Sequence, residues 1–212
     1  MVAYYAERAQ EFERIYEKPE RQEQLGELKR LVRDTLAGRR VIEPACGTGY
    51  WTAVAAEAAA HVTAFDVNDS VLALAQGKGL EPRRVKFLLW DAYEPPAFAE
   101  RFDAALVAFW WSHMPRKRVG GFLERLHAFL EPGAVVLCLD NTFVPGESTP
   151  ITRVDGDGNT FQTRRLENGH QFDVLKNYPT EEAMRVAIGP VADNVEVKWL
   201  RHYWALSYRL RE

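Results

Sequence analysis

The chain has 212 residues, of which 47% are apolar and 27% are charged, and its formal net charge is −3. This length suits a single α/β domain, residues 1–212, with one core, and the charge argues against a nucleic-acid binder, which needs a basic surface. The longest apolar stretch, around 104–111, is too short to cross a bilayer, and no signal-peptide pattern opens the chain. Cys46 and Cys138 lie in apolar runs, which indicates buried reduced thiols and a cytosolic protein.

The N-terminal segment has two helical patterns. In the first, Tyr5, Ala9, Phe12 and Tyr16 fall at helical spacing. The second begins after Pro19, has an apolar stripe at positions 25, 28, 32 and 36, and is expected to stop near Gly38.

From position 41 onward, short apolar runs alternate with helical patterns. The runs at 41–46, 61–66, 85–90, 102–110 and 134–140 lack a period of two, so they predict strands of a parallel sheet that helices cover on both faces. The clearest helical pattern spans 119–130, and Pro132-Gly133 is expected to close it. The fold class is therefore α/β, doubly wound and Rossmann-like, with right-handed crossovers.

The last third departs from this alternation. Turn signals at 155–159 and 167–169 flank extended stretches at 160–165 and 171–176, which predicts an inserted β-hairpin within 142–178. A helix at 180–188 and two final strands at 195–203 and 205–210 follow.

A glycine-rich turn, Glu43-Pro-Ala-Cys-Gly-Thr-Gly49, joins the first strand to a helix. Glycine allows a close approach of the backbone to a ligand, and the helix N-terminus offers free N–H groups to a carboxylate or phosphate. A dinucleotide fingerprint would need a further glycine where Thr52 stands, and a triphosphate loop would need Gly-Lys-Ser/Thr. The turn fits the S-adenosylmethionine signature, acid-x-Gly-x-Gly-x-Gly, with Ala45 at the first glycine. A plain turn without a ligand is the alternative.

Two further acids follow strands of the predicted sheet. Asp66 ends the second strand and could accept both ribose hydroxyls of a nucleoside, or could cap the next helix. Asp91 follows the third strand and could accept the adenine amino group, or could be an ordinary turn residue.

With these three segments in order, residues 38–141 resemble the class I S-adenosylmethionine-dependent methyltransferases. A finer resemblance, carried by 4–9, 47–52, 109–115 and 164–176, is to a small bacterial group that includes a phosphonate O-methyltransferase. The resemblance implies a mostly parallel seven-stranded sheet, an N-terminal helical lid at 1–37, S-adenosylmethionine as cofactor and S-adenosylhomocysteine as product. The cofactor site that it implies consists of Tyr5, Glu43, Ala45, Gly47, Gly49, Tyr50, Trp51, Asp66, Val67, Asp91, Ala92 and Phe109.

Four side chains are candidates for the acceptor site. Trp110 follows the fourth strand and could exclude water there, or could simply pack in the core. His113 is a candidate general base, or it caps a helix, and an acceptor that is already an anion would need no base. Arg164 and Lys176 on the hairpin could bind a carboxylate or phosphonate, or could be solvated. The sequence indicates no metal site, because no ligand cluster has metal spacing.

The expected function is methyl transfer to a small molecule, most simply to an oxygen of an anionic acceptor. N-methylation of a small amine and a non-catalytic cofactor-binding module stay open as alternatives. The chain lacks the third glycine that a nicotinamide-dependent oxidoreductase needs. It also lacks the basic surplus of a nucleic-acid methyltransferase and the Asn-Pro-Pro-Tyr motif that such an enzyme carries after the fourth strand. We expect no nucleic-acid or membrane partner, and a monomer or homodimer.

Overall fold

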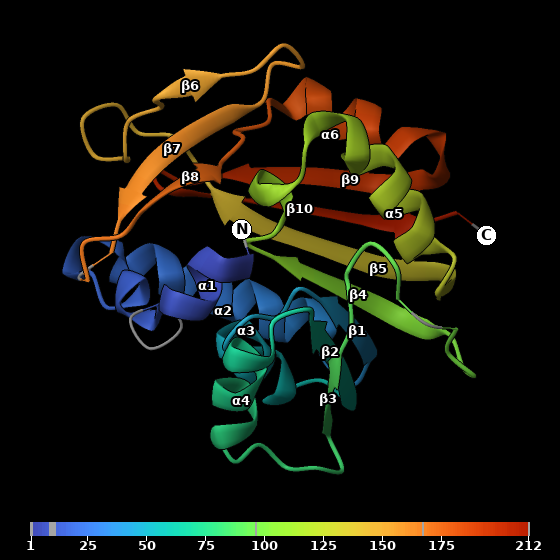
Figure 1. Cartoon of the computed structure of the whole chain (residues 1–212). Coiled ribbons are helices and arrows are strands. Elements are labelled where there is room, and N and C mark those ends of the chain that lie inside the picture. The colour runs from blue at the N-terminus through green and yellow to red at the C-terminus, as the bar shows by residue number, and fades with distance from the viewer. Residues whose placement is uncertain (1, 9–11, 96, 167, 212) are drawn as a thin grey trace.

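A computed structural model describes residues 2–8, 12–95, 97–166 and 168–211. Among these residues, seven strands form one sheet in the order β3-β2-β1-β4-β5-β10-β9 (Figure 1). The first five strands are parallel, and β10 pairs antiparallel with both β5 and β9. This is the doubly wound, mostly parallel sheet that the alternating pattern predicts.

The elements of this sheet follow the predicted ranges closely. Its strands are β1 (Arg40–Pro44), β2 (His61–Asp66), β3 (Val85–Leu89), β4 (Phe102–Ala108), β5 (Leu130–Asn141), β9 (Ala192–Trp199) and β10 (Tyr203–Leu210). The α-helices along the chain are α1 (Val2–Arg8), α2 (Gln22–Leu36), α3 (Tyr50–Ala56), α4 (Asp69–Gly77), α5 (Val119–His127) and α6 (Glu181–Ile188). Short 3-10 helices lie at Phe12–Tyr16, Pro19–Arg21, Trp111–His113, Arg116–Arg118 and Gly189–Val191.

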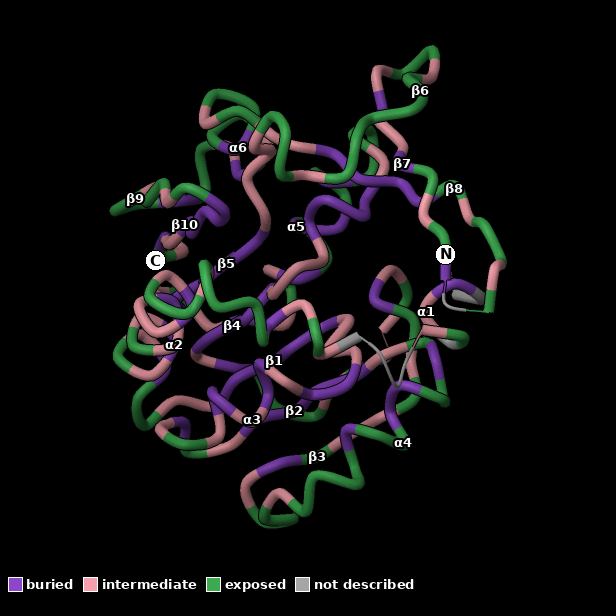
Figure 2. Tube along the Cα trace, turned by 90° about the vertical axis from the view of Figure 1, so that its left-hand side faces the viewer, coloured by how far each residue is buried: buried purple, intermediate pink, exposed green. Residues whose placement is uncertain are grey.

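Helices bury both faces of the sheet. The apolar stripes of α2 and α3 pack on one face against β1, β2, β4 and β5, while α5 and α6 pack on the other. Figure 2 shows the buried segments running through β1, β4 and β5 in the middle of the molecule. This explains the continuous apolar runs of these strands, since neither side of them faces water.

A second, smaller sheet lies outside the main one. It has the order β6-β7-β8, with β6 (Arg153–Val154), β7 (Thr160–Arg165) and β8 (Gln171–Leu175) paired antiparallel. The predicted hairpin is β7–β8, and β6 adds a short edge strand that the sequence pattern did not indicate. Tyr4 and Tyr5 of α1 pack with Phe172 and Val174 of β8, so the N-terminal helix and the hairpin form one small cluster (Figure 1).

Three sequence predictions need correction. The helix predicted over 119–130 ends at His127, and Pro132-Gly133 lies inside β5, where a pairing irregularity between Phe102 and Ala104 of β4 accommodates it. The first helical pattern contains two kinds of helix, the α-helix Val2–Arg8 and a 3-10 helix at Phe12–Tyr16; its Ala9 lies outside the described residues. Cys46 is only half-buried, while Cys138 is fully buried, and both thiols are free.

The N-terminal segment 1–37 has two structural roles. Leu25, Leu28, Val32 and Leu36 of α2 are fully buried against the sheet, and Gly38, with a φ of 70°, follows the helix as predicted. By contrast, α1 and the 3-10 helices at Phe12–Tyr16 and Pro19–Arg21 contribute residues to the cavities at the carboxyl ends of the strands. None of the described helices is long and apolar enough to cross a membrane.

Candidate active site

Two cavities meet at the carboxyl edge of the parallel strands. The first is lined by the turn after β1, the ends of β2 and β4, and the segment after β3. Every residue of the predicted cofactor set lines it except Gly49, and so do His113 and Trp110. The other lining residues carry no site signal in the sequence; they are Tyr16, Cys46, Thr48, Asn68, Val71 and Ala108.

The turn after β1 owes its shape to three left-handed residues. Ala45, Gly47 and Gly49 have φ values of 54°, 57° and 74°. A Cβ on Gly47 would meet nothing within 4 Å, so its surroundings leave room beside the cavity, whereas a Cβ on Gly49 would lie 2.9 Å from Cβ of Ala75 in α4. Gly49 therefore lets α3 and α4 pack closely, and the strain at Ala45 is of order 1–2 kcal/mol because it has a Cβ.

Glu43 is a buried acid without a hydrogen-bond donor. It is 1% exposed, is the penultimate residue of β1 and lines the first cavity. Neither carboxylate oxygen has a hydrogen-bond partner of good geometry among the described residues. Burial raises the pKa of Glu43 to about 8, and the nearby Thr52 hydroxyl offsets this only in part. An unpaired buried carboxylate is costly, so this arrangement calls for a positively charged or hydrogen-donating group in the cavity.

Asp66 and Asp91 occupy the neighbouring strand ends. Asp66 accepts hydrogen bonds from the backbone N–H groups of Gly47 (3.0 Å) and Asn68 (2.9 Å), and thereby ties the end of β2 to the glycine turn. Burial raises its pKa, while these hydrogen bonds oppose the rise. Asp91 is exposed and accepts a hydrogen bond from the Tyr93 N–H (2.8 Å). Both acids line the first cavity.

Aromatic side chains form much of the remaining wall. Phe109 has a φ of 57°, an unfavourable conformation for a bulky residue, and stacks on Trp51 with 5.6 Å between ring centroids. Tyr16 stacks on Tyr50 at 3.9 Å and accepts a hydrogen bond from Nε1 of Trp51 (3.1 Å). This packing holds the strained backbone of Phe109 at the place where the two cavities meet.

Trp110, which the sequence analysis assigned to the acceptor, lines the first cavity and not the second. Its Nε1–H is buried and has no acceptor among the described residues. Its neighbour Trp111 is a core residue that contacts Trp204.

The second cavity is polar and lies under the hairpin. Its volume is about 430 Å³, and it shares Tyr5, Phe109 and His113 with the first cavity. Its walls come from α1, the 3-10 helix at Pro19–Arg21, β7 and the segment after β5. Basic side chains are concentrated there, namely Arg8, Lys18, Arg21, Arg164, Arg165 and Lys176, whereas Glu147 is the acid among the described lining residues.

Arg164 and Lys176 both line this cavity, but their environments differ. Lys176 is 3% exposed, and its Nζ donates to Ser112 Oγ (2.6 Å), Asp140 Oδ1 (3.0 Å) and Asn141 Oδ1 (2.9 Å). Arg164 donates to Gln162 Oε1 (2.8 Å) and to the Tyr4 hydroxyl (3.3 Å) and makes no ion pair with a described carboxylate. The charge of Arg164 is thus available to an anion, while that of Lys176 is compensated by Asp140.

His113 lies at the junction of the two cavities with both ring nitrogens engaged. Nδ1 donates to the Leu175 carbonyl (2.8 Å), so Nε2 accepts from the Tyr5 hydroxyl (2.8 Å). Burial lowers the pKa of His113 well below 6.5, and the charges of Lys176 and Arg164 lower it further. The imidazole is therefore neutral near pH 7 and only weakly basic.

Comparison with known proteins agrees with this architecture. A model of the methyltransferase domain matches residues 41–133. Demethylmenaquinone methyltransferase from Staphylococcus aureus (strain JH9) is 29% identical over 119 residues, which are 54% of this chain and 48% of that protein. The chain therefore spans about half the length of the curated relatives it matches.

Solved structures match over nearly the whole chain. The complex of DhpI with SAM and HEP has a TM-score of 0.80 and 25% identity, and covers 98% of this chain and 95% of that one. The DhpI–SAH complex has a TM-score of 0.78 and 26% identity, with 99% and 95% covered. The N-methyltransferase NodS from Bradyrhizobium japonicum WM9, at 16% identity, TM-score 0.62 and coverage of 92% and 98%, shares the fold alone.

The fold is that of the class I methyltransferases, and residues 41–133 match the methyltransferase domain. More particularly, the cofactor that these solved neighbours indicate is S-adenosylmethionine. The residues at the first cavity fit this cofactor, because the unpaired, buried Glu43 carboxylate matches the ammonium group of an amino acid. The unpaired Nε1–H of Trp110 offers a second, independent contact.

Proposed function

We propose that the protein transfers a methyl group from S-adenosylmethionine to an oxygen of a small anionic acceptor, a phosphonate or a carboxylate. The observation that carries this proposal is Arg164, a guanidinium that lines the second cavity without a carboxylate partner among the described residues. A cavity rich in Arg and Lys is complementary to an anion. The proposal includes a cytosolic protein that is a monomer or homodimer.

The cofactor would occupy the first cavity. We assign Glu43 to its ammonium group, the turn at Ala45 and Gly47 to its carboxylate, Asp66 and Val67 to the ribose, and Asp91, Ala92 and Trp110 to the base. Tyr5, Tyr50, Trp51 and Phe109 would enclose it and exclude water. Gly49 acts indirectly, through the packing of α3 on α4.

In this reaction the side chains mainly have to position the acceptor against the methyl group. When bound, S-adenosylmethionine supplies a methyl group on a positively charged sulfur. Arg164 holds the acceptor anion beside the shared wall of the two cavities. One oxygen of the anion can then approach the methyl group in line. An anionic oxygen already carries the lone pair that forms the new O–C bond, so no proton has to be removed first.

In this mechanism His113 orients the acceptor and does not act as a base. Its low pKa and the hydrogen bond from Tyr5 suit a neutral group that positions the acceptor and the N-terminal helix. Tyr5 connects α1 to this histidine, which supports assigning α1 and the 3-10 helix at Phe12–Tyr16 as the lid of the site.

The test is direct. Purified protein is incubated with S-adenosylmethionine and panels of small phosphonates, carboxylates and amines, and mass spectrometry locates the added methyl group. We expect methyl esters from the anions. Arg164→Gln should raise the acceptor KM by about 100-fold, the scale of a charge-assisted contact, while Arg153→Gln, an exposed arginine on the same small sheet, should leave it unchanged.

The alternatives give different results. Methylation of the amines alone would replace this proposal with an N-methyltransferase, and no product from any panel, with intact S-adenosylhomocysteine binding, would favour a non-catalytic cofactor-binding module. An acceptor KM that does not respond to Arg164→Gln would remove Arg164 from the site.

A further inference from the structure

The second cavity has basic side chains on two separate walls. Arg164 and Tyr4 are on the wall that β7 and α1 form. Arg21 belongs to the 3-10 helix Pro19–Arg21, just before α2. It lies against Tyr203 at the start of β10, with 6.0 Å from its guanidinium carbon to the ring centroid. The two arginines therefore reach the same cavity from different parts of the fold.

Arg21 has a buried donor without an acceptor. Its Nε is shielded from solvent and has no hydrogen-bond partner among the described residues, and no described carboxylate forms an ion pair with the guanidinium. The guanidinium does interact with the neutral Tyr203 hydroxyl, because the charge of Arg21 and a hydrogen bond from it both oppose the rise that burial causes in the pKa of Tyr203. A buried guanidinium N–H without an acceptor costs free energy, and this donor belongs to a residue that lines the cavity.

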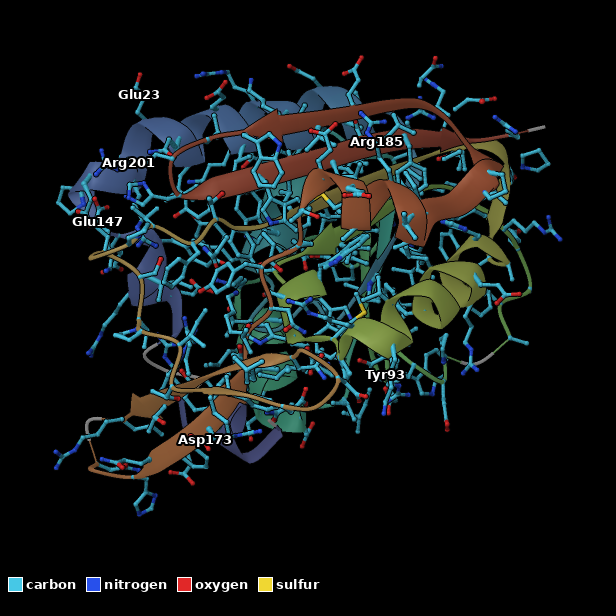
Figure 3. The ribbon with its side chains drawn as sticks, turned by 90° about the horizontal axis from the view of Figure 1, so that it is seen from above. Glu23, Tyr93, Glu147, Asp173, Arg185 and Arg201 are labelled. Atoms are coloured by element: carbon cyan, nitrogen blue, oxygen red, sulfur yellow. The ribbon has the colours of Figure 1, made fainter. Side chains whose placement is uncertain are left out.

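The nearby acid does not compensate Arg21. Glu147 hydrogen-bonds to Arg201 and, at 2.7 Å, to Nε2 of His202, and Figure 3 shows Glu147 and Arg201 next to each other at one corner of the molecule. His202 is held in turn by Gln24 of α2, whose Nε2 donates to Nδ1 (3.0 Å). The Glu147 carboxylate is thus occupied by these two partners, and the end of the cavity at Arg21 retains a positive charge.

We propose that Arg21 forms a second anion subsite, so that the acceptor carries a carboxylate in addition to the anionic group that Arg164 binds. This inference rests on the proposed function, since it takes the second cavity as the acceptor site. It narrows the substrate class from any small anion to compounds with anionic groups at both ends, such as phosphonocarboxylates. The exposed Lys18, which also lines the cavity, would add only long-range attraction.

Binding to the protein saturated with S-adenosylhomocysteine tests the subsite without turnover. Calorimetry compares ethylphosphonate, which has one anionic group, with phosphonoacetate and its homologues with one and two more methylene groups. For the best-fitting homologue we expect affinity about tenfold or more above that of ethylphosphonate, the size of one charge-assisted hydrogen bond. Arg21→Met should abolish this preference and leave ethylphosphonate and S-adenosylhomocysteine binding unchanged.

Lys18→Met is the matched control, because it removes one exposed charge from the same wall. It should change the preference by less than about threefold. If both variants lost the preference for the compounds with two anionic groups equally, the attraction would be diffuse and the subsite would be overturned. Equal binding of all these compounds by the wild-type protein would overturn it as well.

Methylation of the same compounds separates this inference from the function on which it rests. If ethylphosphonate is methylated but the second anion brings no advantage, the Arg21 subsite fails and the proposed function stands. If the binding preference depends on Arg21 but no compound is methylated, the proposed function fails and the subsite stands. If none of the compounds binds to the wild-type protein, both fail.

Discussion

The hydroxyl of Tyr5 donates a 2.8 Å hydrogen bond to Nε2 of His113, 108 positions further along the chain. This contact joins the N-terminal helix to the turn after β4 at the place where the two cavities meet. Since Nδ1 of the same ring donates to Leu175 of β8, one neutral imidazole connects the main sheet, the hairpin and α1. The geometry is that of a positioning residue.

The first prediction concerns the pH dependence of catalysis. Because its pKa lies well below 6.5, His113 stays neutral between pH 6 and 9, and kcat/KM should be flat over this range for an acceptor that is fully ionised above pH 5. Tyr5→Phe should lower kcat/KM about tenfold, since it leaves a buried acceptor nitrogen unpaired. Steady-state rates across the pH range check both. A rise in rate with an apparent pKa between 6 and 8 that disappears in His113→Gln would instead make His113 the base.

The second prediction concerns Glu43 and stability. Its folded-state pKa of about 8 lies above its ordinary value of 4.5. The folded protein therefore retains a proton that the unfolded chain releases, and the associated stability is complete below pH 4.5 and lost as pH rises to about 8. Within this window Glu43 contributes a slope of about −1.4 kcal/mol per pH unit. Denaturant unfolding of cofactor-free protein should show that Glu43→Gln removes this slope and stabilises the protein at pH 8.

The same residue should couple ligand binding to proton release. An ammonium group beside Glu43 favours the carboxylate, so S-adenosylhomocysteine binding at pH 7 should release about one proton. Calorimetry in buffers of different ionisation enthalpy measures this number. The Glu43→Gln variant should bind S-adenosylhomocysteine about 10- to 100-fold more weakly and release no proton. Equal affinity and equal proton release in both proteins would show that the ammonium group does not bind beside Glu43.

The sheet was predictable because the strands of a parallel sheet are buried on both faces, so their positions appear as continuous apolar runs. The prediction of one helix over 119–130 was wrong for a related reason. Leu126 and Leu130 are both buried at helical spacing, yet the chain leaves the helix at His127 and Leu130 already pairs with Phe102. Apolar spacing alone could not separate a helix end from the start of a strand.

Within the candidate site, the sequence indicated residue types but not their partners. Glu43 and Gly47 lie at the carboxyl end of β1 and Asp66 lies at that of the neighbouring β2, so topology alone brought them together. The buried pairing of Lys176 with Asp140 joins β5 to the residue after β8 and has no signal in spacing. The helical spacing of Tyr16 gave no sign of a site role, yet its ring stacks on Tyr50 in the wall of the first cavity.

The third prediction separates the two glycines of the turn. Gly49→Ala should destabilise the protein by about 2–5 kcal/mol, because the new Cβ both requires a left-handed backbone and meets Cβ of Ala75 at 2.9 Å. Gly47→Ala carries the backbone cost alone, about 1–2 kcal/mol, since nothing lies within 4 Å of its Cβ. Its main effect should be on the affinity for S-adenosylhomocysteine. Thermal unfolding and calorimetry of both variants distinguish packing from ligand contact, and equal loss of stability in the two would contradict the assignment.

The fourth prediction concerns Lys176, which the sequence placed in the acceptor site beside Arg164. Lys176→Met leaves Asp140 charged and buried without a counter-ion, so it should destabilise the protein by about 3–5 kcal/mol. Denaturant unfolding measures this loss. The carboxylate would still accept hydrogen bonds from the backbone and hydroxyl of Ser112, which directly precedes His113.

A double substitution distinguishes stability from acceptor binding. Lys176→Met with Asp140→Asn removes both charges and should recover at least half of the lost stability, because no isolated charge stays buried. If Lys176 only supports the turn at Ser112, the acceptor KM of this double variant should stay within about threefold of the wild-type value, while Arg164→Gln raises it about 100-fold. An acceptor KM that stays high in the stable double variant would show that the ammonium group of Lys176 contacts the acceptor despite its ion pair with Asp140.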